Sequence, residues 1–119
     1  MSQNRKLIAI IEDDAVLRRG LSRFFRKENC EVIDFENGLE ASVALNDTKP
    51  DMILCDYDLP GLNGLEVLRG VRNAGKKTPF FLITGYYTDE LSEKADNSGA
   101  TAMFEKPIDL ETLRNCCSL

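Results

Sequence analysis

Three short apolar runs divide the chain: Leu7 to Ile11, Met52 to Cys55, and Phe80 to Ile83. They lack the alternation of polar and apolar residues that marks a half-exposed strand, so they predict strands buried on both faces, as in a parallel sheet. Two further runs, Cys30 to Phe35 and Ala102 to Glu105, contain charged residues. We expect these two runs to form the edges of the same sheet.

The segments between the runs carry apolar residues at helical spacing, which predicts amphipathic helices. These residues are Leu17, Leu21 and Phe24; Leu39 and Val43; Leu65, Leu68 and Val71; and Leu110, Leu113 and Cys117.

Two asparagines indicate where helices begin. Asn37 precedes Glu40 by three residues, and Asn63 precedes Glu66 by the same interval. This spacing is typical of an N-terminal cap, in which the asparagine side chain binds free backbone N–H groups. The segment at residues 88–99 offers little apolar surface, so we expect a fourth helix that is short or mobile.

Strand and helix therefore alternate along the chain, with five of each expected. Right-handed crossovers between parallel strands would fold this pattern into a three-layer α/β domain. The length of 119 residues suits one domain covering residues 1–119.

Charge and composition exclude several classes of function. The chain has 20 acidic and 15 basic residues, a net charge of -5, and no cluster of cations that could follow a nucleic acid. No apolar stretch approaches the ~20 residues that cross a bilayer, and no signal-peptide pattern is present, so we expect no membrane association and a cytoplasmic protein.

The chain contains four cysteines and no histidine. The cysteines, without CxxC spacing, are expected to be free and mostly buried, and a Cys/His metal site is excluded. The lack of histidine excludes Ser/His and Cys/His triads and a histidine phosphocarrier. Any histidine chemistry must therefore come from a partner.

Polar residues follow the strand-like runs where a site would form. Glu12 and Asp13 follow the first run, Asp56 the third, Thr84 the fourth and Lys106 the fifth. In an open parallel sheet, ligands bind outside the carboxyl ends of the strands. Clustered carboxylates repel one another unless a proton or cation intervenes, and oxygen ligands suit Mg²⁺. With a lysine and a hydroxyl added, the set suits phosphoryl transfer.

These residues lie in motifs that resemble the response regulator receiver family over essentially the whole chain. The motifs, in order, are Ile10-Ile11-Glu12-Asp13-Asp14, Leu54-Cys55-Asp56-Tyr57-Asp58-Leu59-Pro60-Gly61-Leu62-Asn63-Gly64, Ile83-Thr84-Gly85 and Phe104-Glu105-Lys106-Pro107. The resemblance implies a CheY-like, flavodoxin-like fold with sheet order 2-1-3-4-5, and a two-component signalling function.

The resemblance also implies a role for each site residue. Asp56 would accept a phosphoryl group from a partner's phosphohistidine, with Thr84 and Lys106 contacting the transferred group. The implied Mg²⁺ ligands are Asp13, Asp56 and the backbone carbonyl of Asp58, with Glu12 assisting through water. The peptide bond before Pro107 would be cis.

The implied partners are a sensor histidine kinase or histidine phosphotransfer protein, and either a separate output protein or an effector domain beyond Leu119. The switching face would be the fourth helix, fifth strand and fifth helix. At the position where the family usually has an aromatic switch residue, this chain has Met103, which puts signalling through that side chain in question. A receiver promotes its own phosphorylation and slow dephosphorylation and is not a multi-substrate enzyme.

Two alternatives remain open. The set Asp56, Asp58, Thr84 and Lys106 is also similar to haloacid dehalogenase phosphatases, although their metal-binding acidic pair follows the lysine, whereas here the pair is at residues 12 and 13. A receiver-like binding module that works without phosphorylation is the second alternative.

Overall fold

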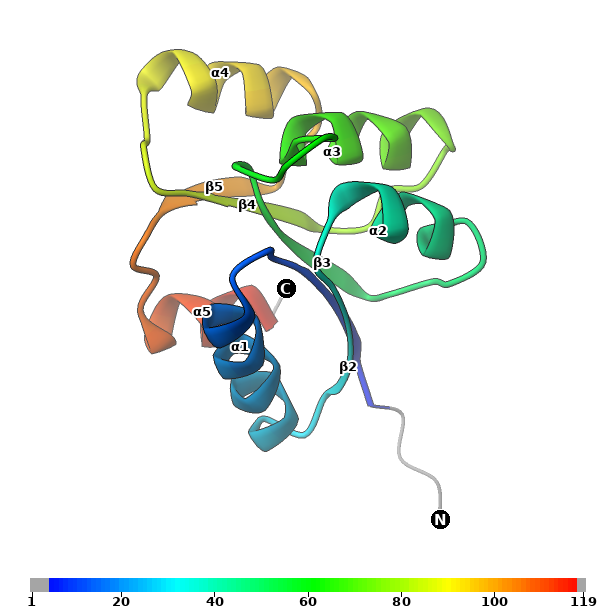
Figure 1. Ribbon diagram of the computed structural model, residues 1–119, viewed down its shortest axis with the longest axis vertical. Coiled ribbons are helices and arrows are strands. Elements are labelled where there is room, and N and C mark those ends of the chain that lie inside the picture. The colour runs from blue at the N-terminus through cyan, green and yellow to red at the C-terminus, as the bar shows by residue number, and fades with distance from the viewer. Residues whose placement is uncertain (1–4, 118–119) are drawn as a thin grey trace.

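The computed structural model describes residues 5–117 and forms a three-layer α/β domain (Figure 1). The parallel sheet has the order β2-β1-β3-β4-β5, which confirms the expected doubly wound topology. In chain order the elements are β1 (Leu7–Ile11), α1 (Ala15–Lys27), β2 (Glu31–Phe35), α2 (Gly38–Leu45), β3 (Met52–Asp56), α3 (Gly64–Asn73), β4 (Phe80–Thr84), α4 (Asp89–Asn97), β5 (Ala102–Glu105) and α5 (Leu110–Cys117).

Helices cover both faces of the sheet: α2, α3 and α4 lie on one face, and α1 and α5 on the other (Figure 1). Alternate strand residues point to opposite faces. On β1, for example, Ala9 and Ile11 belong to the core under α2–α4, whereas Ile8 and Ile10 belong to the core under α1 and α5. All residues of β3 and β4 are buried, which confirms the prediction from their apolar runs.

The predicted helix caps are present. Asn63 and Glu66 form a reciprocal capping box at α3, in which the Glu66 N–H donates to Asn63 Oδ1 at 2.9 Å and the Asn63 N–H donates to Glu66 Oε1 at 3.0 Å. Asn37 caps α2 by accepting the Glu40 N–H at 2.8 Å. These contacts satisfy backbone donors that the first helical turn leaves free.

The predicted inward stripe of α2 is wrong. Leu39 is 65% exposed and Val43 is 62% exposed, while Gly38, Ala41 and Leu45 are buried. A Cβ added to Gly38 would lie 2.6 Å from the backbone oxygen of Leu62, so glycine allows this corner of the helix to approach the loop before α3. That close approach sets which side of α2 faces the sheet.

The predictions for the last two helices are confirmed in part. Helix α4 is short, at nine residues, and buries only Ala95 fully, while its mobility stays a prediction. In α5, Leu113 and Cys116 are buried but Leu110 is 55% exposed. Within residues 5–117 no helix combines the length and apolar composition needed to cross a membrane.

Candidate functional site

The residues that follow four of the strands converge at the carboxyl edge of the sheet. Because β1, β3, β4 and β5 are parallel neighbours, their ends meet there. Asp56 ends β3 and Thr84 ends β4, while Glu12 and Lys106 come directly after β1 and β5. The structure thus brings together the set that the strand ends predicted.

Three carboxylates form the centre of this site. One oxygen from each of Glu12, Asp13 and Asp56 lies within 4.8 Å of the others. Glu12 is fully buried and Asp56 is 1% exposed, whereas Asp13 is exposed. Repulsion between the buried carboxylates of Glu12 and Asp56 is therefore poorly screened by solvent.

Lys106 is the cation that faces the buried carboxylates. Its Nζ lies 3.0 Å from Asp56 Oδ2 and 3.1 Å from Glu12 Oε1. Burial by itself would lower the pKa of Lys106, but the bonds to Asp56 and Glu12 outweigh it and leave the pKa raised. Lys106 therefore stays charged at neutral pH and bridges the two acids.

Glu12 is the carboxyl group whose protonation is most altered. The pKa of Glu12 is raised to about 7, mainly by burial. The Asp14 N–H opposes this rise, the charge of Asp56 adds to it, and Lys106 opposes it. Its Oε2 accepts the Asp14 N–H at 3.1 Å. Its buried Oε1 has the ion pair with Lys106 but no hydrogen bond of good geometry within the described residues.

These residues fit a divalent cation. Three carboxylates facing one ammonium leave two uncompensated negative charges when all are ionised. The donors are all oxygens, the exposed Asp13 leaves the cluster open on one side, and Glu12 Oε1 lacks a full partner. This combination suits Mg²⁺, which prefers oxygen ligands and keeps several waters.

Thr84 is already engaged by a side chain that the sequence prediction overlooked. Its Oγ1 donates to Asp58 Oδ2 at 3.2 Å and accepts the Tyr86 N–H at 3.2 Å. Asp58 was expected to contribute only its backbone carbonyl. Its position in the sequence could have indicated this contact. Asp58 lies two residues after Asp56, which pairs with Ile83 near the end of β4.

The loop after β3 holds Asp56 and Asp58 in place. The Asp58 N–H donates to Asp56 Oδ1 at 3.0 Å, and the Tyr57 N–H donates to Ile83 O on β4 at 2.7 Å. A Cβ on Gly64 would lie 2.5 Å from Asp56 O, so only glycine lets the start of α3 approach the loop after β3 so closely.

Comparison with known proteins identifies the family. The sequence model of the response regulator receiver domain matches residues 8–117. The chain belongs to this family. It is 28% identical over 112 residues to sporulation initiation phosphotransferase F of Bacillus subtilis (strain 168), covering 94% of this chain and 90% of that one.

Two further matches are a longer protein and a solved structure. A cyclic di-GMP phosphodiesterase of Thermotoga maritima is 33% identical over 107 residues, which cover 90% of this chain but 28% of the relative. A CheY-like receiver domain from Methanospirillum hungatei JF-1 superposes with a TM-score of 0.92 at 24% identity, covering 97% of this chain and 92% of that one. The latter likeness shows the fold.

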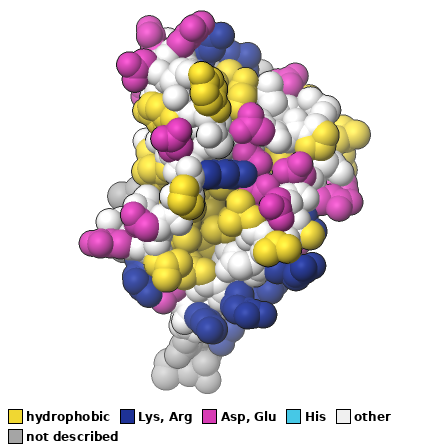
Figure 2. All heavy atoms as spheres, turned by 60° about the vertical axis from the view of Figure 1, so that its left-hand side comes forward, with side chains coloured by type: hydrophobic (Ala, Val, Ile, Leu, Met, Phe, Trp, Pro, Cys, Tyr) yellow, Lys and Arg dark blue, Asp and Glu magenta, His cyan; other side chains and the backbone are white. Residues whose placement is uncertain are grey.

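An apolar groove borders the site of this receiver domain. It has a volume of about 500 Å³, runs between α1 and α5, and reaches Lys106. Figure 2, which looks toward the edge where the strands end, shows hydrophobic side chains gathered in a hollow with acidic side chains grouped beside it. The lining residues are Leu17, Gly20, Leu21, Phe24, Lys106, Pro107, Ile108, Leu110 and Leu113.

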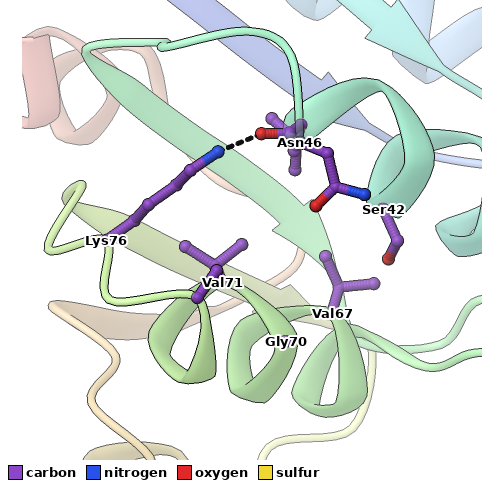
Figure 3. Close-up of a pocket in the computed structure, with 8 residues that line it drawn as sticks. Ser42, Asn46, Val67, Gly70, Val71 and Lys76 are labelled. Carbon is purple, nitrogen blue, oxygen red and sulfur yellow. Dashed lines mark hydrogen bonds between the residues drawn. The ribbon is translucent and has the colours of Figure 1, made fainter.

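A second hollow of about 170 Å³ between α2 and α3 lies away from this chemistry (Figure 3). Asn46 follows the end of α2 and Lys76 follows α3, so the hollow is at the opposite edge of the sheet from Asp56. Lys76 Nζ donates to the Leu45 carbonyl across it. This bond ties the two helices together, and we assign the hollow no catalytic part.

The cysteines of the receiver domain contribute no ligand to the site. Cys30, Cys55, Cys116 and Cys117 are free, and the first three are buried, as expected. Burial raises the pKa of the Cys55 thiol, and the charges of Asp56 and Glu12 raise it further. Cys55 therefore packs beneath the site as a neutral thiol. The Lys106–Pro107 peptide bond is cis, as the resemblance implied.

Proposed function

We propose that this receiver domain accepts a phosphoryl group on Asp56 from a partner's phosphohistidine, with Mg²⁺ bound at the acidic cluster. The observation that carries the proposal is the setting of Asp56: a carboxylate 1% exposed, 3.0 Å from Lys106 Nζ, within the cluster that suits a cation. Thr84 ends the neighbouring strand. Family membership supports the same role, and residues 1–119 are taken as one receiver domain.

In the transfer, a carboxylate oxygen of Asp56 forms a bond to phosphorus while the bond from phosphorus to the imidazole nitrogen of the donor breaks. The Asp58 N–H and the Lys106 ammonium orient the two oxygens of Asp56. Bound Mg²⁺ would neutralise charge on the phosphoryl oxygens. Glu12, Asp13, Asp56 and the carbonyl of Asp58 would hold it, Glu12 through water.

The donor must supply the histidine, because the chain has none. A sensor histidine kinase or a histidine phosphotransfer protein meets this need. The donor must reach Asp56, and the apolar groove between α1 and α5 lies beside that site. We also propose that the domain works in the cytoplasm. The proposal involves no direct binding of nucleic acid and no membrane insertion.

The output is proposed to pass through the face formed by α4, β5 and α5, toward a separate protein or an effector domain linked beyond Leu119. Met103 on β5 is partly buried and packs against the core under α2–α4. Methionine is flexible and apolar, so it fills space beside a moving Thr84 without a phenolic hydroxyl to hold one rotamer. We therefore propose a shallow switch carried mostly by residues 88–99.

The test is labelling with a small-molecule phosphodonor and Mg²⁺, followed by intact-mass measurement. The wild type should gain one phosphoryl group as an acyl phosphate that is base-labile, and Asp56→Asn should gain none. Asp47→Asn is the matched control, because Asp47 is exposed and follows α2, at the opposite edge of the sheet from Asp56. Undiminished labelling of Asp56→Asn would refute the assignment.

The same experiment separates the alternatives. A wild type that folds but takes no label would favour a phosphorylation-independent binding module. Rapid turnover of a generic phosphomonoester would favour a phosphatase, although the match to the receiver family over residues 8–117 gives that alternative no support.

A further inference from the structure

The side chain of Asp58 connects two parts of the site. It leaves the loop after β3, and its Oδ2 accepts the Thr84 hydroxyl at 3.2 Å and, more weakly, the Gly85 N–H at 3.4 Å. The backbone N–H of the same residue donates to Asp56 Oδ1. Asp58 therefore touches both the proposed phosphoacceptor and the residue that ends β4.

A threonine hydroxyl has one proton to donate. Here that proton is directed to Asp58, and the hydroxyl oxygen is used as an acceptor by the Tyr86 N–H. Thr84 is fully buried, so solvent offers no further partner. A phosphoryl oxygen on Asp56 can receive the Thr84 proton only if Asp58 gives it up.

We propose that the Asp58 carboxylate is a positioning residue that holds Thr84 in the unphosphorylated form and competes with the phosphoryl group for its hydroxyl proton. The inference rests on the proposed function of Asp56. Release of Thr84 also releases Gly85, which begins the segment leading to α4 (Asp89–Asn97). Asp58 thus sets how readily phosphorylation moves the end of β4.

Removing the competitor should favour the phosphorylated state. A hydrogen bond to an exposed charged group is modest, so Asp58→Ala should raise the affinity for a phosphoryl mimic by about tenfold, which corresponds to about 1.4 kcal/mol. The backbone groups of Asp58 are unchanged in this variant. Loss of a negative charge near the mimic would also raise affinity, and the test must separate the two causes.

A double-mutant cycle makes that separation. Binding of beryllofluoride is measured by titration calorimetry for the wild type, Asp58→Ala, Thr84→Val and the double variant, each at a Mg²⁺ concentration that saturates it. The proposal expects Asp58→Ala to strengthen binding clearly more in the Thr84 background than in the Thr84→Val background, where only the effect of the lost charge remains. Equal strengthening in both backgrounds would mean charge repulsion alone and would overturn the proposal.

Hydrogen exchange provides a second readout. In the unphosphorylated protein, Asp58→Ala should speed exchange at residues 85–88, whereas Asp47→Ala should not. Unchanged exchange in Asp58→Ala would also overturn the proposal. A wild type that binds no beryllofluoride and accepts no phosphoryl group would instead refute the proposed function of Asp56, and the inference with it.

Discussion

The buried carboxyl group of Glu12 should reduce the stability of the metal-free protein, and Glu12→Gln tests this. Glu12 is fully buried and shares Lys106 with Asp56. Burial raises its pKa to about 7 from an ordinary value of 4.5, so ionising it in the folded state is unfavourable. Glutamine keeps the shape of the side chain without the charge.

The sign follows from proton linkage. Below about pH 4.5 Glu12 is protonated in both folded and unfolded chains, so its ionisation has no effect on stability. Between about pH 4.5 and pH 7 the unfolded chain loses the proton while the folded protein keeps it, and wild-type stability falls as pH rises. Above about pH 7 the loss is complete.

The shift in pKa corresponds to about 3 kcal/mol at most. This shift already includes the attraction of Lys106, but the buried glutamine amide must itself be desolvated, which offsets part of the gain. We therefore expect Glu12→Gln to raise the free energy of unfolding by roughly 1 to 3 kcal/mol at about pH 8, or about 3–6 °C in Tm per kcal/mol.

The assay is thermal and urea unfolding of both proteins in EDTA across about pH 4.5 to 8, with the difference between them plotted against pH. That difference should be near zero or negative at the acid end and should grow through the interval where Glu12 ionises only in the unfolded chain. A difference independent of pH, or largest in acid, would refute the reasoning.

Two further predictions concern the cation and the switch. Asp13→Asn should raise Tm without metal, because it removes a charge from the carboxylate cluster, and should gain less from added Mg²⁺ than the wild type; equal gains in thermal scans would exclude Asp13 as a direct ligand. Met103→Ala should leave labelling of Asp56 nearly intact but alter the response of residues 88–99 to beryllofluoride, measured by hydrogen exchange. No response of those residues in the wild type would contradict the proposed route from Thr84.

Helix α3 illustrates how far local pattern determines the fold. Leu65, Leu68 and Val71 were predicted to face the core and are buried. The stripe could be recognised because residues such as Glu66 and Arg69 alternate with it and are exposed. The continuous apolar runs likewise identified the central strands, and the parallel order then placed Asp56, Thr84 and Lys106 at one edge.

Helix α2 shows where pattern is insufficient. Apolar residues lie on most sides of this helix, so periodicity alone does not distinguish the inward side. The close approach of Gly38 to the backbone of Leu62 sets its rotation and leaves Leu39 and Val43 exposed. That approach joins residues from separate segments and has no local signal in the chain.

The sequence by itself determined the order of elements and the set of polar residues at the strand ends, because both depend on local periodicity and on the geometry of parallel strands. Only the tertiary structure decided the state of those residues: the burial that raises the pKa of Glu12, the sharing of Lys106 by two acids, and the bond from Thr84 to Asp58. Such properties depend on distances and solvent exclusion between segments far apart in the chain, which no local pattern specifies.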